Sequence, residues 1–272
     1  MSTASVLIPA DHIDRAAAPG PRYTLLLSTD PAHIEAAQRL RHDVFTAEPG
    51  FALDTAADGL DADRFDQFCD HLLVREDASG ELVGCYRMLP PPGAIAAGGL
   101  YTATEFDVRA LDALRPSLVE MGRAVVRAEH RHGGVVLLMW AGILAYLDRC
   151  GYEYVTGCVS VPTHPPGLEP GSLLRGVRDV VRRRHSAPAD HTVRPYRPVI
   201  IDGRSLDQIE PPARFTMPAL MRGYLRLGAQ VCGEPAHDPA FGVGDFPALL
   251  DKSRADVRYL KRLRSVSQAA GQ

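Results

Sequence analysis

The chain has 272 residues, 46% of them hydrophobic, which is enough to bury the core of one or two globular domains. Its formal net charge of -3 gives no overall positive field and argues against nucleic acid as a partner. Its five cysteines are odd in number and lack paired CxxC spacing, which argues against a disulfide framework or a zinc knuckle. We therefore expect a soluble protein of the reducing cytoplasm.

The N-terminal residues 1–20 contain acidic side chains and no sustained apolar run, so they predict a flexible leader rather than a signal peptide or a membrane span. The longest apolar stretch, residues 133–147, is shorter than the roughly 20 residues that a bilayer crossing needs. It predicts a buried helix. Any membrane contact would then be peripheral, at the inner face of the membrane.

Residues 21–160 have the hydrophobic pattern of an α/β core in the order β-α-ββ-α-β-α-β. Pro31 opens the first helix, and Pro49-Gly50 closes it. A turn at 77–80 joins two strands into an antiparallel hairpin, and a Pro-rich loop follows at 90–93. The other predicted elements are strands at 22–28, 71–76, 82–89, 118–128 and 153–159 and helices at 105–114 and 135–149.

Residues 161–272 predict the remainder of the core with a C-terminal helical extension. The stretch 162–212 is dense in Pro, Arg and His and is typical of an insertion or lid, with one strand at 193–201. Further on, the pattern predicts a helix at 218–227, a short strand or helix at 243–250, and a charged terminal helix at 254–264.

A basic Gly-Gly turn, formed by Arg131, His132, Gly133 and Gly134, directly precedes the long apolar helix. Glycines allow close backbone approach, and the amides of a helix N-terminus can receive a phosphate. The turn therefore predicts a site for the phosphorylated arm of an acyl carrier. A simple loop that joins strand to helix is the alternative.

Five separated blocks carry a family resemblance: RHDVF at 41–45, FDQFCD at 65–70, GCYRMLP at 84–90, VEMGR at 119–123 and the Gly-Gly turn. The turn resembles the acyl-coenzyme A loop of the GCN5-related N-acetyltransferase (GNAT) superfamily, although Val136 stands where that loop usually carries a small residue. Together the blocks resemble the ornithine N-acyltransferases of ornithine-lipid synthesis and the related N-acyl homoserine lactone synthases. YTATEFDV at 101–108 and the segment 221–246 resemble the ornithine branch.

The resemblance implies a GNAT-like mixed central sheet flanked by helices, with no permanently bound cofactor. The acyl donor would be an acyl carrier protein thioester or acyl-CoA, and 21–160 would form the acyltransferase core with its acyl-carrier site. A backbone amide among Ala124, Val125 and Val126 would polarise the thioester carbonyl. A long acyl chain would also need an apolar surface. The long helix offers Leu137, Met139, Trp140, Ile143 and Leu144, although packing of this helix on the sheet accounts for them equally well.

Amide formation from a thioester needs a neutral amine, so a base must take a proton from an ammonium group. We favour Glu120 as that base, with Glu48 and Asp66 as further candidates. Asp66 and Asp70 are equally suited to hold a cationic substrate side chain.

Three arginines of the same blocks leave other roles open for these acids. Arg41, Arg87 and Arg123 could form structural ion pairs with them, or Arg41 or Arg87 could bind the carboxylate of an amino acid. We expect Phe45 either to pack in the core or to contact the acyl chain.

The basic cluster Arg175, Arg178, Arg182, Arg183 and Arg184 would suit an acidic acyl carrier protein or form a solvated surface. The histidines at 130, 132, 164 and 185 have no metal-ligand spacing, so we expect no metal. We expect an N-acyltransferase that moves a long, possibly 3-hydroxylated acyl group from acyl carrier protein to the α-amine of ornithine. The alternatives are transfer to another amine, as in lactone synthases, and a non-catalytic acyl-carrier or lipid-binding module.

Overall fold

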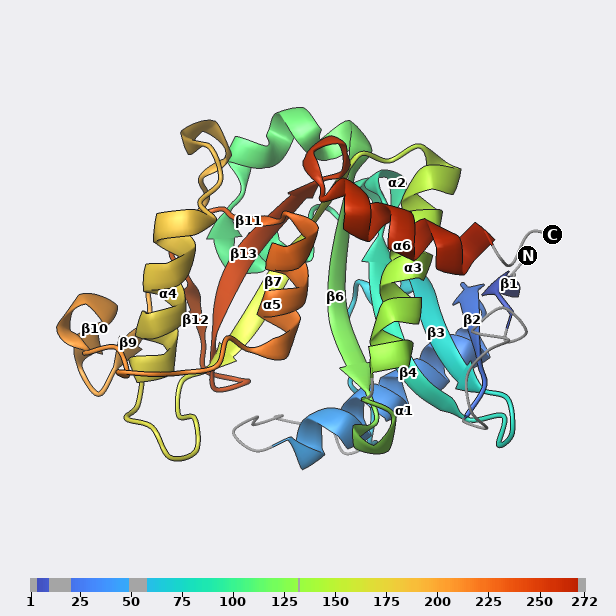
Figure 1. Ribbon diagram of the computed structural model, residues 1–272, viewed down its shortest axis with the longest axis horizontal. Coiled ribbons are helices and arrows are strands. Elements are labelled where there is room, and N and C mark those ends of the chain that lie inside the picture. Colours follow the sequence, from blue (N-terminus) through green and yellow to red (C-terminus); the bar gives the residue numbers. More distant parts are fainter. Residues whose placement is uncertain (1–3, 10–20, 49–57, 132, 269–272) are drawn as a thin grey trace.

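A single nine-stranded mixed sheet runs through the computed structural model, which describes residues 4–9, 21–48, 58–131 and 133–268 (Figure 1). Its path is β1-β2-β3-β4-β6-β7-β13-β11, and β12 pairs with β13. All neighbours are antiparallel except β6 and β7. The predicted mixed α/β fold is confirmed. The strands of this sheet are β1 Ala4–Ile8, β2 Tyr23–Ser28, β3 Asp70–Glu76, β4 Leu82–Leu89, β6 Leu118–Val126, β7 Tyr154–Pro162, β11 Gln230–Val231, β12 Ala236–Asp238 and β13 Val243–Asp251.

Helices cover both faces of the sheet. On one face α1 packs over Leu26, Leu73 and Cys85; on the other, α3 packs over Leu25 and Leu72. Neighbouring residues of one strand therefore serve different cores, as the alternation of a strand requires. Among the described residues no helix is long and apolar enough to cross a membrane. The helices are α1 Pro31–Ala47, α2 Pro91–Ala96, α3 Gly133–Cys150, α4 Ser172–Arg184, α5 Ala219–Leu227 and α6 Val257–Gln268.

The parallel strands β6 and β7 pair only at their beginnings, from Leu118 opposite Tyr154 to Glu120 opposite Thr156. Beyond that point they separate, as Figure 1 shows. A Cβ on Gly157 would lie 2.2 Å from the carbonyl oxygen of Met121, so only glycine allows this approach where the strands part. The splayed strands open the space in which the candidate site lies.

A β-bulge interrupts the pairing of β4 with β6. Cys85 lies opposite Val125 but Arg87 lies opposite Gly122, so β6 carries one extra residue. Arg123 sits within this bulge in the left-handed conformation, with φ of 54°. Strained non-glycine backbone of this kind concentrates at functional sites.

Two regions differ from the sequence prediction of a leader and a lid. Within the predicted leader, Ala4–Ile8 forms β1 on the edge of the sheet, and Ile8 is buried; residues 10–20 lie outside the described part. Within 162–212, the predicted insertion contains α4, whose Leu174, Val177 and Val181 belong to the main core. Their spacing is helical, but the many prolines and arginines around them concealed it.

Other boundaries also differ. Residues 91–96 form α2 instead of a loop, and 105–114 is not one helix: the 3-10 helices Tyr101–Thr104 and Arg109–Ser117 flank β5, Phe106–Asp107. Prolines break the predicted strand at 193–201 into β8, Arg194–Pro195, and β9, Ile200–Ile201, which pairs with β10, Arg204–Ser205. Residues 243–250 belong to a strand, β13, and the predicted stop at Pro49-Gly50 lies outside the described residues.

Candidate active site

A cleft with two arms lies where β6 leaves β7. We call them the polar arm, which contains Arg87, Glu120, Arg123 and Asp245, and the apolar arm, which contains Val125, Met139 and Trp140. Both arms share Phe45, Tyr86, Ala124 and Leu220, so they meet at the bulge of β6. A reaction at this junction would have a polar reactant on one side and an apolar one on the other.

Three arginines and three aspartates form an ion-pair network beside the polar arm. Arg41 is 1% exposed and bonds Asp61 at 2.8 Å and Asp66 at 2.9 Å. The arginines Arg87 and Arg123 complete the network, with Arg87 at 2.6 Å from Asp63 and Arg123 at 3.3 Å from Asp61. The charges balance, which is what buried ions require.

The network fixes the charge of Asp66. Burial alone would raise the pKa of this carboxyl, but the charge and hydrogen bonds of Arg41 and the charge of Arg87 hold that pKa well below its usual range. A carboxylate with so low a pKa is a poor proton acceptor near neutral pH. The structure thus places Asp66 in an ion pair, and Arg41 beside it does not line the cleft.

Glu120 occupies a different environment. It is 4% exposed and accepts hydrogen bonds from the backbone N–H of Tyr101 at 2.5 Å, from that of Thr102 at 2.6 Å and from the Thr102 hydroxyl. Burial raises the pKa of Glu120, and these hydrogen bonds oppose the rise. It lines the polar arm without a salt bridge to any described residue.

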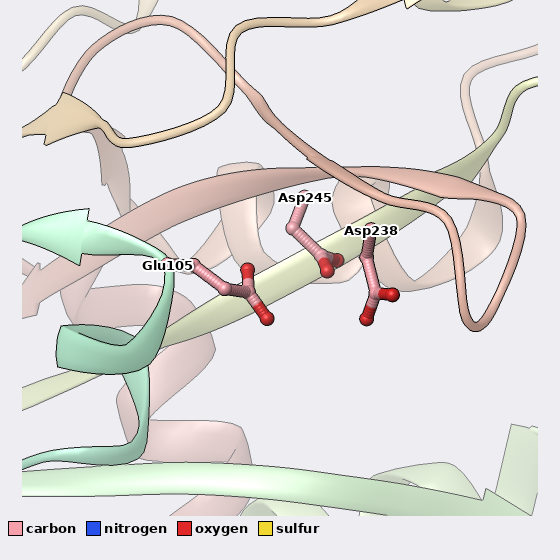
Figure 2. Close-up of side chains that lie close together, drawn as sticks. All are labelled: Glu105, Asp238 and Asp245. Carbon is pink, nitrogen blue, oxygen red and sulfur yellow. The ribbon is translucent and has the colours of Figure 1, made fainter.

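A second set of carboxylates, which we call the acid triad, lies at the polar arm: Glu105, Asp238 and Asp245 (Figure 2). Asp238 and Asp245 line the arm, and Glu105 lies next to them. One oxygen of each lies within 4.8 Å of the others. Glu105 follows the 3-10 helix Tyr101–Thr104, while the two aspartates come from β12 and β13, and the three carboxylates point toward one another. No described Lys or Arg forms a salt bridge with any of them.

Two members of the acid triad accept hydrogen bonds from neutral donors. The Ser160 hydroxyl donates to Asp245 at 2.6 Å, and the Ala240 N–H donates to Asp238 at 2.9 Å. Burial, reinforced by the other acids, raises the pKa of Glu105 and of Asp245. Such a set attracts a cation, either an ammonium group or a hard divalent metal ion.

The apolar arm brings together most residues predicted to bind the acyl donor. Ala124, Val125, Val126 and Arg131 line it together with Met139, Trp140 and Ile143. Its volume of about 390 Å³ lies in the ordinary range of small-molecule sites. Beyond Glu120, β6 pairs with no described strand on its β7 side, so its backbone there borders the cleft. His132 lies outside the described residues, and α3 begins at Gly133 with Gly134 exposed.

Other candidates lie elsewhere. Glu48 lines the apolar arm and forms an ion pair with Arg131 at 2.7 Å. Glu120, by contrast, lines the polar arm. Asp70 faces α3, where its carboxylate accepts a 2.7 Å hydrogen bond from Tyr146, and it does not line either arm. Phe45 lines both arms and contacts Phe241 edge-on at 5.8 Å.

The basic cluster predicted to bind an acyl carrier protein lies on α4, which in Figure 1 lies beyond α5 from α3. Much of its charge is already paired. Arg175 pairs with Asp179 and Arg178 with Asp207. Arg182 lies 3.6 Å from Glu234. Such paired side chains offer less charge to an acidic partner.

Sequence reasoning missed the acid triad, Tyr86, and the partner aspartates 61 and 63. A signal for the triad existed: Glu105 lies in the block 101–108, and Asp238 and Asp245 lie in the segment 221–246. Both blocks resemble the ornithine branch. The pairing of β12 with β13 brings Asp238 near Asp245, and Glu105, more than 130 residues earlier, meets them only in the folded chain.

Comparisons with known proteins agree with this architecture. The acetyltransferase (GNAT) domain family matches residues 40–141. The structure of the CoA-dependent acyl-homoserine lactone synthase BjaI with SAM and isopentyl-CoA has the same fold, at a TM-score of 0.50 and 16% identity over 88% of this chain and 92% of that one.

Curated relatives extend the match along the chain. The L-ornithine N(alpha)-acyltransferase of Brucella abortus (strain 2308) is 37% identical over 246 residues, 86% of each chain. The protein of that name from Rhizobium meliloti (strain 1021) is 34% identical over 244 residues, 86% of this chain and 81% of its own. This chain therefore belongs to the L-ornithine N(alpha)-acyltransferase family and is an N-acyltransferase with a GNAT-like fold.

Proposed function

We propose that the protein transfers a long acyl group from a phosphopantetheine thioester to the α-amine of ornithine, giving a lyso-ornithine lipid. The observation that carries the proposal is the acid triad at the end of the polar arm, opposite an apolar arm. Ornithine is a cation at its side chain, and the names of the relatives support it as the acceptor.

The acyl donor occupies the apolar arm in this proposal. The acyl chain packs between Met139, Trp140 and Leu220, and the thioester carbonyl lies near Ala124, where unpaired amides of β6 can stabilise an oxyanion. Arg131 and the N-terminus of α3 receive the phosphate of the arm. We propose an acyl carrier protein as donor, with acyl-CoA as the alternative, and a 3-hydroxyacyl group as the cargo.

The acceptor occupies the polar arm. Glu105, Asp238 and Asp245 hold the δ-ammonium group, and Arg123 or Arg87 is positioned to meet the α-carboxylate. A δ-ammonium group held by carboxylates keeps its proton and cannot attack. The triad would thereby direct acylation to the α-amine.

The chemistry then proceeds at the junction of the arms. Glu120, whose pKa burial raises, takes a proton from the α-ammonium, directly or through water. The freed nitrogen attacks the thioester carbon, a tetrahedral oxyanion forms, and the carbon–sulfur bond breaks. The thiol leaves with a proton, and the nitrogen is left as an amide.

The test is an assay of the purified chain with 3-hydroxyacyl carrier protein and either ornithine or norvaline, which has the same carbon chain without the δ-amine. We expect N-acyl ornithine by mass spectrometry and at least about a hundredfold lower kcat/KM for norvaline, because the acid triad would remain uncompensated. Equal use of both amino acids would contradict the acceptor site.

The Glu120→Gln variant separates an enzyme from a non-catalytic carrier-binding module. An enzyme loses turnover but still binds the acyl carrier protein. The control is Thr102→Val, which removes only one of the hydrogen bonds to Glu120. If neither the intact chain nor the control forms any N-acyl amine although both bind the acyl carrier protein, the protein is a non-catalytic carrier-binding module.

A further inference from the structure

The helices α5 and α6, with the turn before α6, are rich in basic residues. Residues 219–227 and 252–268 contain eight Lys and Arg side chains and a single acidic one, Asp256, whereas the whole chain has 30 basic and 33 acidic residues. The excess is therefore local. The eight are Arg222, Arg226, Lys252, Arg254, Arg258, Lys261, Arg262 and Arg264.

Three of these cations are neutralised within the protein. Lys252 and Arg264 pair with Asp148, and Arg254 pairs with Asp251. The other five are exposed and form no salt bridge with any residue in the described part of the chain: Arg222, Arg226, Arg258, Lys261 and Arg262. We call these five residues the α5–α6 basic surface.

The two helices are in contact. The backbone N–H of Asp256, just before α6, donates to the carbonyl of Leu227 at the end of α5, at 3.1 Å. Leu260 and Leu263 anchor α6 on the main core, so its basic side chains lie on the outside. Figure 1 shows α6 crossing α3 above the end of α5.

The apolar arm borders α5, one of the two helices that carry this surface. Ala219, Leu220 and Gly223 of α5 line the arm, and Arg222 is their neighbour in the same helix. Leu220 is 39% exposed and Val257, at the start of α6, is 63% exposed. Exposed aliphatic side chains among unpaired cations are typical of proteins that bind the interface of an anionic bilayer.

We propose that the α5–α6 basic surface docks the enzyme on an anionic lipid bilayer. The inference rests on the proposed function, because N-acyl ornithine is an amphiphile that leaves the apolar arm more readily into lipid than into water. Charge complementarity selects the bilayer: five unpaired cations match a phosphate-rich surface.

The test is sedimentation of the full chain with vesicles of phosphatidylcholine alone or mixed with phosphatidylglycerol. We expect binding only to the anionic vesicles, and its loss on going from about 0.1 M to about 1 M salt, where the screening length falls to roughly 3 Å. The triple variant Arg258→Gln, Lys261→Gln, Arg262→Gln should bind at least tenfold more weakly, since each cation near the membrane contributes about fivefold.

The matched control removes three cations of α4, by Arg182→Gln, Arg183→Gln and Arg184→Gln, and should change vesicle binding by less than twofold. Equal loss in both triple variants, or no binding of the intact chain to anionic vesicles, overturns the proposal. A higher KM for acyl carrier protein in the α6 variant without a change in vesicle binding would assign the surface to that acidic protein instead. Vesicle binding needs no turnover, so a failure of the proposed function would appear separately, as absent N-acyl ornithine.

Discussion

Two sets of three acidic residues line or border one cleft, and they differ in whether arginines neutralise them. Asp61, Asp63 and Asp66 are matched by Arg41, Arg87 and Arg123, and the pKa of Asp66 is held well below its usual range. The acid triad forms no salt bridge with a described Lys or Arg; a hydroxyl donates to Asp245 and a backbone amide to Asp238, and burial raises the pKa values of Glu105 and Asp245.

The difference assigns separate tasks to chemically similar groups. The arginine–aspartate network balances its own charges, so it mainly holds the wall of the cleft, and only its members Arg87 and Arg123 also line the polar arm. The acid triad is incomplete and gains most from a cation that arrives later. In the free protein the acid triad lowers the free energy of unfolding, a cost that is common at sites selected for binding.

Breaking the arginine–aspartate network should have the largest effect on folding. Arg41→Met leaves Asp61 and Asp66 buried without a partner, and we expect a loss of about 3–5 kcal/mol in the free energy of unfolding, measured with urea. Arg39→Met is the control, because its pair with Glu35 is more than half exposed and should contribute at most about 0.5 kcal/mol. Similar losses in the two variants would show that the network does not stabilise the fold.

Changing the acid triad should instead affect substrate use. Asp245→Asn should lower kcat/KM for ornithine by about 30-fold to 1,000-fold, the range expected for removing one side of a buried charge contact. Its unfolding free energy should not fall. Ser160→Ala removes the hydrogen bond to Asp245 but no charge, and it should cost tenfold at most. If Ser160→Ala lowered kcat/KM as much as Asp245→Asn, the position of the Asp245 side chain would matter more than its charge.

The acid triad should also make stability depend on pH. Burial, then the charges of Asp245 and Asp238, raises the pKa of Glu105, so the folded state keeps a proton that the unfolded state releases. Its contribution to stability is therefore complete below about pH 4 and is lost as the pH rises toward the raised pKa. Glu105→Gln should then be more stable than the native chain at pH 8 by at least about 1 kcal/mol. Thermal unfolding of both proteins at pH 4 and at pH 8 measures this difference. Equal stabilisation of Glu105→Gln at pH 4 would show that better packing, rather than the proton on Glu105, is the cause.

The two sets also show what the sequence can predict. The core helices and strands were found from the length of their apolar segments, which is a long uninterrupted run in α3 and a strand-length segment in β6. The arginines at 41, 87 and 123 were identified from blocks of a family, and their ion pairing was one of the predicted alternatives. Their partners Asp61 and Asp63 follow a segment without a hydrophobic period, so nothing local marked them.

The acid triad could not be predicted from spacing. Glu105 is more than 130 residues before Asp238, and β12 turns back along β13 to place Asp238 near Asp245. Residues that meet only through sheet pairing carry no sequence period. The helix α4 was missed for another reason: its apolar positions 174, 177 and 181 were obscured by arginines, which drew attention to charge.

The smallest effect is expected from Glu48. Its ion pair with Arg131 is well exposed, at 36% and 43% of the side chains, so Glu48→Gln should cost at most about 1 kcal/mol of stability. Glu48 also lines the apolar arm, on the side proposed for the donor, so kcat should change by less than about threefold.

Glu120→Gln, in the polar arm, should lower kcat by about a hundredfold or more, as expected for removal of a general base. Steady-state assays of both variants decide whether the general base lies in the apolar arm or in the polar arm. Should Glu48→Gln abolish turnover while Glu120→Gln keeps it, the amine would lose its proton at the rim beside Arg131, and Glu120 would serve only to hold the 3-10 helix Tyr101–Thr104 against β6.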